Sequence, residues 1–171
     1  MVTITLPDGS TKQFEAAPTG LDVARSISEG LARDCVAMEI DGQLQDLYLT
    51  IDNDATLRLI TTRDDEALDI MRHSAAHVMA QAILRLNKNA KLTIGPAVEN
   101  QFYYDIDMDP ISEDDFPKIE AEMKKIIKEK LPIRRRVVPK AEAMDFYKDE
   151  PYKLEMISDL EDETISFYEQ G

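Results

Sequence analysis

Met71-Arg72-His73-Ser74-Ala75-Ala76-His77 contains both histidines of this 171-residue chain, four positions apart. On a helix, side chains four residues apart lie on one face, one turn from each other. No charged residue occurs between Arg72 and Arg85. Around the histidines an apolar stripe recurs at helical spacing: Leu68, Met71, Ala75, Met79, Ala82 and Leu86. A helix that is apolar on two faces is normally buried, so the stretch predicts an internal helix with two imidazoles facing a cleft.

Three interpretations of the histidine pair are open from this spacing. The first is a pair of hydrogen-bonded core histidines, since histidine is often partly buried. The second is a zinc site, although the zinc-protease pattern requires Glu directly after the first histidine, where this chain has Ser74. The third is a metal-free hydrolytic site in which neutral imidazole acts as a base or proton shuttle.

Composition limits the class of protein. The chain is 43% apolar, enough for a real core, and its net charge of −14 argues against a general nucleic-acid coat. The single cysteine, Cys35, excludes an intrachain disulfide and is predicted to be a small buried apolar side chain. No run is long enough for a membrane span, and residues 1–8 do not resemble a signal peptide. These features predict a cytoplasmic protein without membrane contact.

The first 60 residues predict a small sheet with one helix across it. Strands are expected at 2–6, 11–15, 36–40, 43–44 and 55–60, because these short runs are apolar or rich in β-branched residues and are bounded by turns. Thr19 is predicted to cap a short helix that Gly30 ends. The order strand-strand-helix-strand-strand-strand suits an α+β arrangement.

The remaining residues alternate between helical and strand patterns. The histidine helix is predicted to begin after a cap at Thr62 or Asp64 and to run to about Leu86. Ser112 and Asp115 resemble a capping box, and the helix that they open is predicted to bury Phe116, Ile119, Met123 and Ile126. Strands are predicted at 91–94, 102–107, 133–138 and 164–168, and further helices at 140–148 and 151–160.

A dense basic run extends from Lys118 to Arg136 and contains eight basic residues and three acidic ones. Such a run could follow a phosphate backbone. It could equally be an ordinary solvated helix face, and the sequence pattern alone leaves both interpretations open.

Several motifs together resemble a known family. Residues 71–77, then Ile94-Gly95-Pro96, then Gln101-Phe102-Tyr103-Tyr104-Asp105, resemble the amino-terminal region of the bacterial threonyl-tRNA synthetase family. Residues 1–61, opening Ile4-Thr5-Leu6-Pro7-Asp8-Gly9-Ser10, resemble its TGS domain, a ubiquitin-like β-grasp module. The resemblance implies an α+β protein with a TGS domain at 1–61 and an editing domain at 62–171, built on a central buried helix against a sheet.

The resemblance also implies a chemical task. A missing methyl group gives only about 10–200-fold discrimination, so a site that accepts threonine also accepts serine. The family's editing domain hydrolyses the resulting seryl-tRNA(Thr), whose acceptor end is the expected partner. By resemblance, the catalytic residues are His73, His77, Tyr104 and Lys153, and Gly95, Pro96 and Asp105 line the substrate pocket. The expected tRNA contacts are Lys124, Lys125, Lys128, Arg134, Arg135 and Arg136.

The family's editing pocket has a second motif, a Cys and a His four residues apart, which should follow the strand predicted at 164–168. The chain is therefore expected to be an amino-terminal fragment with no cofactor of its own and poor hydrolytic activity. ATP, magnesium and zinc, and the surface of a homodimer, are expected only in the missing catalytic domain.

Two other functions remain open. One is a non-catalytic TGS-type RNA-binding or regulatory module, although the net charge of −6 in residues 1–61 speaks against it as the main RNA contact. The other is a zinc hydrolase similar to the alanyl-tRNA editing proteins. With two candidate ligands here, zinc is not expected to bind stably.

Overall fold

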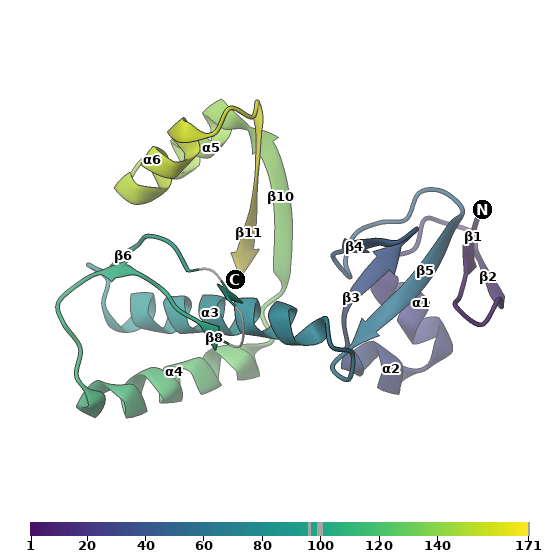
Figure 1. The fold of residues 1–171 in the computed structure, drawn as a ribbon, viewed down its shortest axis with the longest axis horizontal. Coiled ribbons are helices and arrows are strands. Elements are labelled where there is room, and N and C mark those ends of the chain that lie inside the picture. Colours follow the sequence, from purple (N-terminus) through teal and green to yellow (C-terminus); the bar gives the residue numbers. More distant parts are fainter. Residues whose placement is uncertain (96, 99–100, 171) are drawn as a thin grey trace. The chain divides into compact units, whose positions relative to one another are not determined.

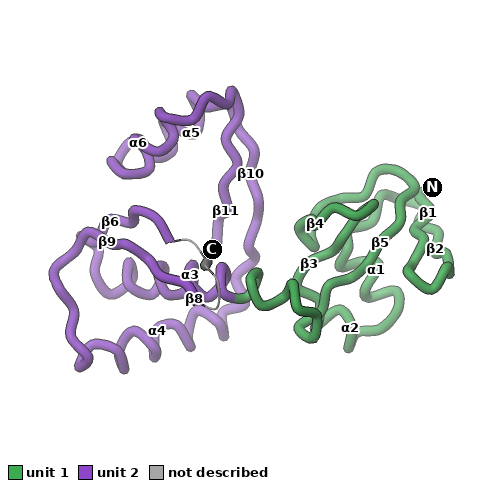
Figure 2. Tube along the Cα trace, in the orientation of Figure 1, with its two compact units in different colours: residues 1–71 green, residues 72–171 purple. Residues whose placement is uncertain are grey.

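The computed structural model describes residues 1–95, 97–98 and 101–170, with the side chains of 97 and 98 left out (Figure 1). The chain forms two compact units, residues 1–71 and residues 72–171 (Figure 2). Each unit combines helices with strands, which confirms the predicted α+β class.

Unit 1 is built on a five-stranded sheet with the strand order β2-β1-β5-β3-β4. β1 pairs in parallel with β5, and the other neighbours are antiparallel. The elements are β1 (Val2–Thr5), β2 (Thr11–Phe14), α1 (Gly20–Ile27), α2 (Glu29–Asp34), β3 (Cys35–Ile40), β4 (Gln43–Gln45) and β5 (Ala55–Thr61). All five strands predicted in this part of the sequence are present.

The predicted single helix is two helices. Thr19 caps α1 as expected, because its hydroxyl accepts from the Asp22 amide and the Asp22 carboxylate accepts from the Thr19 amide. The prediction that Gly30 ends this helix is wrong. Ser28 ends α1 with extended backbone, and its hydroxyl accepts from the Leu31 amide at 3.0 Å, which starts α2. Gly30 lies inside α2.

The core of unit 1 lies where α1 packs against the sheet. Ile4, Val23 and Met38 are fully buried there, and Leu57 is nearly so. Cys35 belongs to the same core with 9% of its surface exposed, which confirms the predicted buried cysteine. Burial is also the main reason why the pKa of its thiol is raised.

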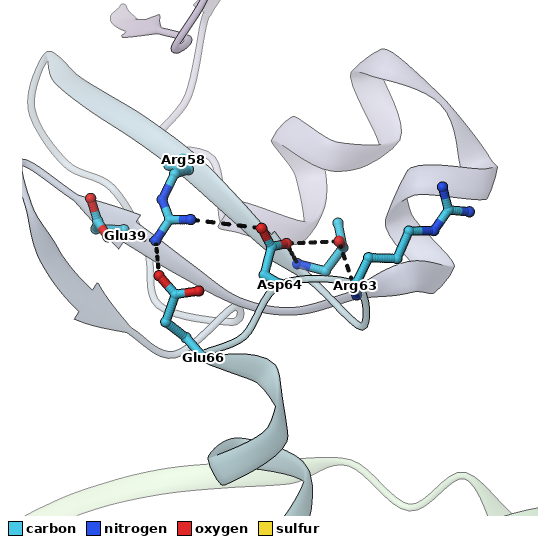
Figure 3. Close-up of polar contacts among 6 residues, drawn as sticks. Glu39, Arg58, Arg63, Asp64 and Glu66 are labelled. Carbon is cyan, nitrogen blue, oxygen red and sulfur yellow. Dashed lines mark hydrogen bonds and ion pairs between the residues drawn. The ribbon is translucent and has the colours of Figure 1, made fainter.

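Unit 1 continues past β5 into α3 (Ala67–Leu86). Ala67 is 1% exposed and packs with Ile60 and Ala37. Arg58 of β5 pairs with Glu39 of β3 at 3.0 Å and with Glu66 at 2.6 Å, directly before α3 (Figure 3). The domain boundary between residues 61 and 62, which the family resemblance implies, stays a prediction. The compact unit seen in the structure extends to residue 71.

In the described part of the chain, unit 2 holds the rest of α3, the helices α4 to α6, a short 3-10 helix, and strands of two to seven residues. Its elements are β6 (Lys91–Leu92), β7 (Ala97–Val98), β8 (Gln101–Phe102), β9 (Ile106–Asp107), η1 (Glu113–Asp115), α4 (Phe116–Glu129), β10 (Ile133–Pro139), α5 (Lys140–Phe146), α6 (Pro151–Asp159) and β11 (Thr164–Gln170). α3 and α4 lie side by side, and Arg85 of α3 holds Glu129 of α4 through two hydrogen bonds of 2.7 and 2.8 Å (Figure 1).

The buried stripe of α3 differs from the predicted one. Leu68, Met71 and Leu86 are 53%, 46% and 50% exposed. The buried residues of the helix beyond its first turn are small side chains and one isoleucine: Ala76, Ala80, Ala82 and Ile83. Small side chains let neighbouring segments approach the middle of the helix, whereas the three exposed apolar residues lie near its ends. In α4, likewise, Phe116 is exposed and Ile126 is buried.

β10 and β11 form a two-stranded antiparallel sheet, one face of which is covered by α5 and α6, the helices that connect the two strands. Val138 and Ile165 pack there with Ala143 of α5 and Ile157 of α6. The predicted strand at 102–107 is instead two short strands in different pairings, since β8 pairs with β7 and β9 pairs with β6. Tyr104 lies in the segment between them.

Candidate active site on the histidine helix

α3 brings its two imidazoles into direct contact. The Nε2 atoms of His73 and His77 are 2.9 Å apart, and the ring centroids are 4.6 Å apart. One ring must donate and the other accept in such a bond, so at least one imidazole is neutral. His73 is exposed and His77 is half-buried, which leaves the pair accessible from the His73 side.

The surroundings of His77 favour its neutral form. Its pKa lies below the ordinary value of 6.5, mainly because burial disfavours the imidazolium, and secondly because His73 and Lys153 are close. His77 is therefore a neutral imidazole at pH 7. The same interaction shows that Lys153, distant in sequence, lies near His77.

Lys153 projects from the first turn of α6. Its half-buried ammonium donates to the backbone oxygen of Thr93 at 3.0 Å. Burial lowers the pKa of Lys153, and the nearby carboxylate of Glu150 opposes that shift. A partly desolvated ammonium interacts more strongly with a negative charge than an ammonium in water does.

Tyr104 is half-buried and packs against Gly95. A Cβ built on Gly95 would overlap the Tyr104 ring, so the close approach requires glycine. Burial raises the pKa of the Tyr104 hydroxyl, which stays protonated and able to donate. The predicted cleft shared by Tyr104 and both histidines stays a prediction.

Asp105 and Pro96 complete the predicted pocket residues. The backbone oxygen of Asp105 accepts from the Thr93 amide at 3.1 Å and from the Thr93 hydroxyl at 2.6 Å, while its side chain is exposed. These bonds extend the β6–β9 pairing, so residues 91–95 and 104–107 form one ribbon, called the β6–β9 ribbon below. Pro96 lies outside the described residues.

The β6–β9 ribbon carries functional groups that sequence reasoning missed. Thr93 holds Lys153, and Asp107 accepts a hydrogen bond of 2.7 Å from the hydroxyl of Tyr152. Lys91 donates to the backbone oxygen of Asp149, directly before α6, at 3.1 Å. No spacing in the sequence indicated these contacts, because they join segments about 45 to 60 residues apart.

The six basic residues predicted to bind tRNA lie on two elements. Lys124, Lys125 and Lys128 are exposed on α4, and Arg134, Arg135 and Arg136 follow each other along β10. Consecutive strand residues point to opposite faces, so Arg135 does not share a face with the other two. Arg136 pairs with Glu169 at 2.7 Å and with Glu142 at 3.3 Å, contacts that tie it to β11 and α5.

The histidine pair does not supply a complete metal site. Across residues 1–95, 97–98 and 101–170, no group of three or more His, Cys, Asp or Glu side chains is placed to hold a metal ion. A structural zinc ion needs four ligands and a catalytic one three. Among the helices in the described part of the chain, none has the length and apolar character needed to cross a membrane.

Comparison with known proteins adds a family context. The model of the TGS domain family matches residues 2–61. The threonine–tRNA ligase of Desulforapulum autotrophicum is 64% identical over all 171 residues, and that of Desulfatibacillum aliphaticivorans is 63% identical over the same length. The threonine–tRNA ligase of Halalkalibacterium halodurans is 51% identical over 177 aligned positions. The chain spans 27% of the length of each of these relatives.

Proposed function

The chain belongs by sequence to the threonine–tRNA ligase family and carries a TGS domain, and from this premise we propose that unit 2 hydrolyses mischarged seryl-tRNA(Thr). The need for such an activity follows from the substrates. Serine lacks only one methyl group of threonine, and a site that binds threonine cannot reject it by more than about 10–200-fold. A second site that hydrolyses the seryl ester supplies the missing discrimination.

The observation that carries this proposal is the hydrogen-bonded imidazole pair beside a half-buried ammonium. Ester hydrolysis needs a base for the attacking water and a stabiliser for the oxyanion that forms. His77 is held neutral by burial, and its 2.9 Å contact links it to the exposed His73. Lys153, close to His77, is the cation of the site.

In the proposed reaction, the imidazole pair takes a proton from water as the water oxygen attacks the seryl carbonyl carbon. The carbonyl oxygen becomes the oxyanion, and Lys153 or the Tyr104 hydroxyl stabilises it. The bond from the carbonyl carbon to the ribose oxygen then breaks, and the imidazole pair returns its proton to that oxygen. The products are serine and tRNA with a free terminal hydroxyl.

The test is a deacylation assay in a chimera in which residues 1–171 replace the aligned residues of the Desulforapulum autotrophicum ligase. Removing a general base typically costs about 10²–10⁴-fold. We expect His73→Ala and His77→Ala each to reduce seryl-tRNA(Thr) hydrolysis within that range. Tyr48→Phe is the matched control, because Tyr48 is an exposed residue of unit 1. Unchanged hydrolysis in both histidine variants would reject the proposal.

The 171-residue chain alone is expected to hydrolyse seryl-tRNA(Thr) much more slowly than the chimera. In the family, the editing pocket includes a Cys/His motif outside the residues that carry the resemblance. Catalytic groups that act together lose more than an additive share when part of the set is absent. Equal rates for chain and chimera would contradict this division of the site.

The acceptor end of tRNA(Thr) is the proposed partner of the exposed lysines on α4 and of Arg134 and Arg135. Each phosphate contact contributes about one unit to the slope of log affinity against log salt. Replacing Lys124, Lys125 and Lys128 by Gln in the chimera should therefore flatten that slope, while Lys88→Gln, at an exposed lysine elsewhere in unit 2, should not. An unchanged slope would make α4 an ordinary solvated helix face.

We propose that other parts of the ligase charge tRNA(Thr) with threonine and ATP. The sites for magnesium and zinc and the homodimer contacts are proposed to lie there too. A non-catalytic RNA-binding or regulatory role of the TGS domain is the alternative. A chimera that binds tRNA(Thr) but does not hydrolyse seryl-tRNA(Thr) would favour that alternative.

A further inference from the structure

We propose that the hydrogen bond between Tyr152 and Asp107 positions the Lys153 ammonium for catalysis by fixing the first turn of α6 on the β6–β9 ribbon. This inference rests on the proposed hydrolytic function, since it names residues that act on the site through Lys153. Tyr152 and Asp107 are positioning residues and not catalytic ones. Neither was indicated by the sequence motifs.

Three side chains join the start of α6 to the β6–β9 ribbon. The Tyr152 hydroxyl donates to Asp107 Oδ2 at 2.7 Å, and the Lys153 ammonium donates to the Thr93 oxygen at 3.0 Å. From the ribbon side, Lys91 donates to the Asp149 oxygen at 3.1 Å and pairs with the Glu150 carboxylate at 3.4 Å. Lys91 belongs to β6 and Asp107 to β9, so both strands of the ribbon contact the start of α6.

The geometry of a helix makes these contacts act on Lys153. Consecutive helical side chains point about 100° apart, since a turn has 3.6 residues. Tyr152 and Lys153 thus leave α6 in different directions and both end on the ribbon. Two such anchors restrict rotation of the helix about its axis as well as its distance from the ribbon. With the Tyr152 anchor removed, Lys153 and the contacts of Lys91 would have to hold the first turn of α6.

The first turn of α6 begins without a side-chain cap. Glu150, the residue before α6, makes no side-chain capping bond, and Pro151 has no backbone N–H. At the other end, Ile157 is buried in the core beside β10 and β11. The far end of α6 is therefore fixed by apolar packing, and its first turn is fixed by the polar contacts with the ribbon.

Position matters for Lys153 because the proposed role is electrostatic. A displacement of about 1 Å in a catalytic group can cost about a hundredfold in rate. The Tyr152–Asp107 bond itself is exposed to solvent, and losing such a bond changes stability little. The loss of this bond should therefore affect hydrolysis more than folding, which separates a positioning role from a structural one.

The first experiment measures Lys153 directly in the 171-residue chain, through NMR titration of its ¹³Cε signal. Lys153 is faced by Glu150 at the start of its own helix and by His77 of α3. In Tyr152→Phe the ammonium should become more exposed to water, so its pKa should rise toward the ordinary lysine value. Asp107→Asn and Asp107→Ala remove the same charge, but asparagine keeps an acceptor for Tyr152. We expect the pKa of Lys153 to be higher in Asp107→Ala than in Asp107→Asn.

The second experiment measures hydrolysis of seryl-tRNA(Thr) by the chimera. We expect Tyr152→Phe and Asp107→Ala to lower kcat about tenfold with little change in KM, a fraction of the full cost of misplacing a catalytic group. Asp107→Asn should restore most of kcat. Tyr48→Phe in unit 1 again removes an exposed tyrosine hydroxyl and should leave both constants unchanged.

Thermal unfolding of each variant is measured first, and if Tyr152→Phe does not fold, Asp107→Ala breaks the same bond and keeps the tyrosine. An unmoved Lys153 titration in the folded variants would overturn the inference, as would a higher KM at unchanged kcat. If the unsubstituted chimera does not hydrolyse seryl-tRNA(Thr), the proposed function fails. The Lys153 titration would still decide separately whether the Tyr152–Asp107 bond positions that ammonium.

Discussion

At the scale of single residues, the positive charge of Lys153 contributes to keeping His77 neutral. Burial, then His73 and then Lys153 hold the pKa of His77 below 6.5. Lys153→Met removes a positive charge that disfavours the imidazolium, so the pKa of His77 should rise toward 6.5. NMR titration of the His77 ring proton measures this shift, with Lys148→Met at an exposed lysine of the same unit as the control. A fall in the pKa of His77 would show that Lys153 does not act as described.

Gly95 is a second residue whose surroundings decide what can replace it. In Gly95→Ala the new Cβ would overlap the Tyr104 ring, and such overpacking typically costs about 1–3 kcal/mol. Chemical denaturation should show this loss in unit 2. The control is Gly30→Ala in α2, where the nearest side-chain atom is 3.8 Å away and alanine should stabilise the helix by about 0.5–1 kcal/mol. Equal effects of the two substitutions would argue against close packing at Gly95.

The candidate site was only partly predictable at this scale. The proximity of His73 and His77 follows from helical spacing alone. Lys153 was predicted to be a catalytic residue only from the family resemblance. Its local sequence does not distinguish it from an ordinary surface lysine. Thr93 and Asp107 gave no sequence signal. Their roles arise from tertiary pairing of the β6–β9 ribbon with α6, which no local pattern encodes.

At the scale of elements, the local sequence correctly indicated the helix cap at Thr19. Thr19 makes both bonds of a capping box with Asp22. Thr19→Ala should destabilise unit 1 by about 1 kcal/mol, whereas Thr19→Ser keeps the hydroxyl and should cost much less. Urea unfolding monitored through unit 1 measures both variants. Equal loss in the two would mean that the methyl group of Thr19, and not its hydroxyl, stabilises α1.

Two elements show why local patterns failed elsewhere. Gly30 was predicted to end the helix, but α1 ends at Ser28. The extended backbone of Ser28 terminates α1, and its side chain caps α2. The alternation at 102–107 predicted one strand, but β8 and β9 pair with different partners. Alternation describes which side chains face a core, and it does not say how many partners a segment has.

At the scale of the whole molecule, the fold class was predictable from the sequence, and the contacts of unit 1 extend beyond β5. A polypeptide of residues 1–71 should be more stable than one of residues 1–61, because Ala67 and Ile70 cover Ile60 and Ala37. Apolar burial of this size is worth about 1–2 kcal/mol. Thermal unfolding of both polypeptides measures the difference. No difference would mean that these contacts do not stabilise unit 1.

The reactivity of Cys35 can report local opening of unit 1. Cys35 is the single thiol of the chain, it lies in the core of unit 1, and its partner in the β3–β5 ladder is Thr61. Its burial limits access of a thiol reagent in the closed unit, and its raised pKa slows reaction further. The rate at which Cys35 is labelled therefore reports local opening of unit 1. It does not report directly on motions around His73 and His77, which belong to unit 2. If a ligand that binds at the histidines changes this signal, its effect has passed from residues 72–171 to residues 1–71.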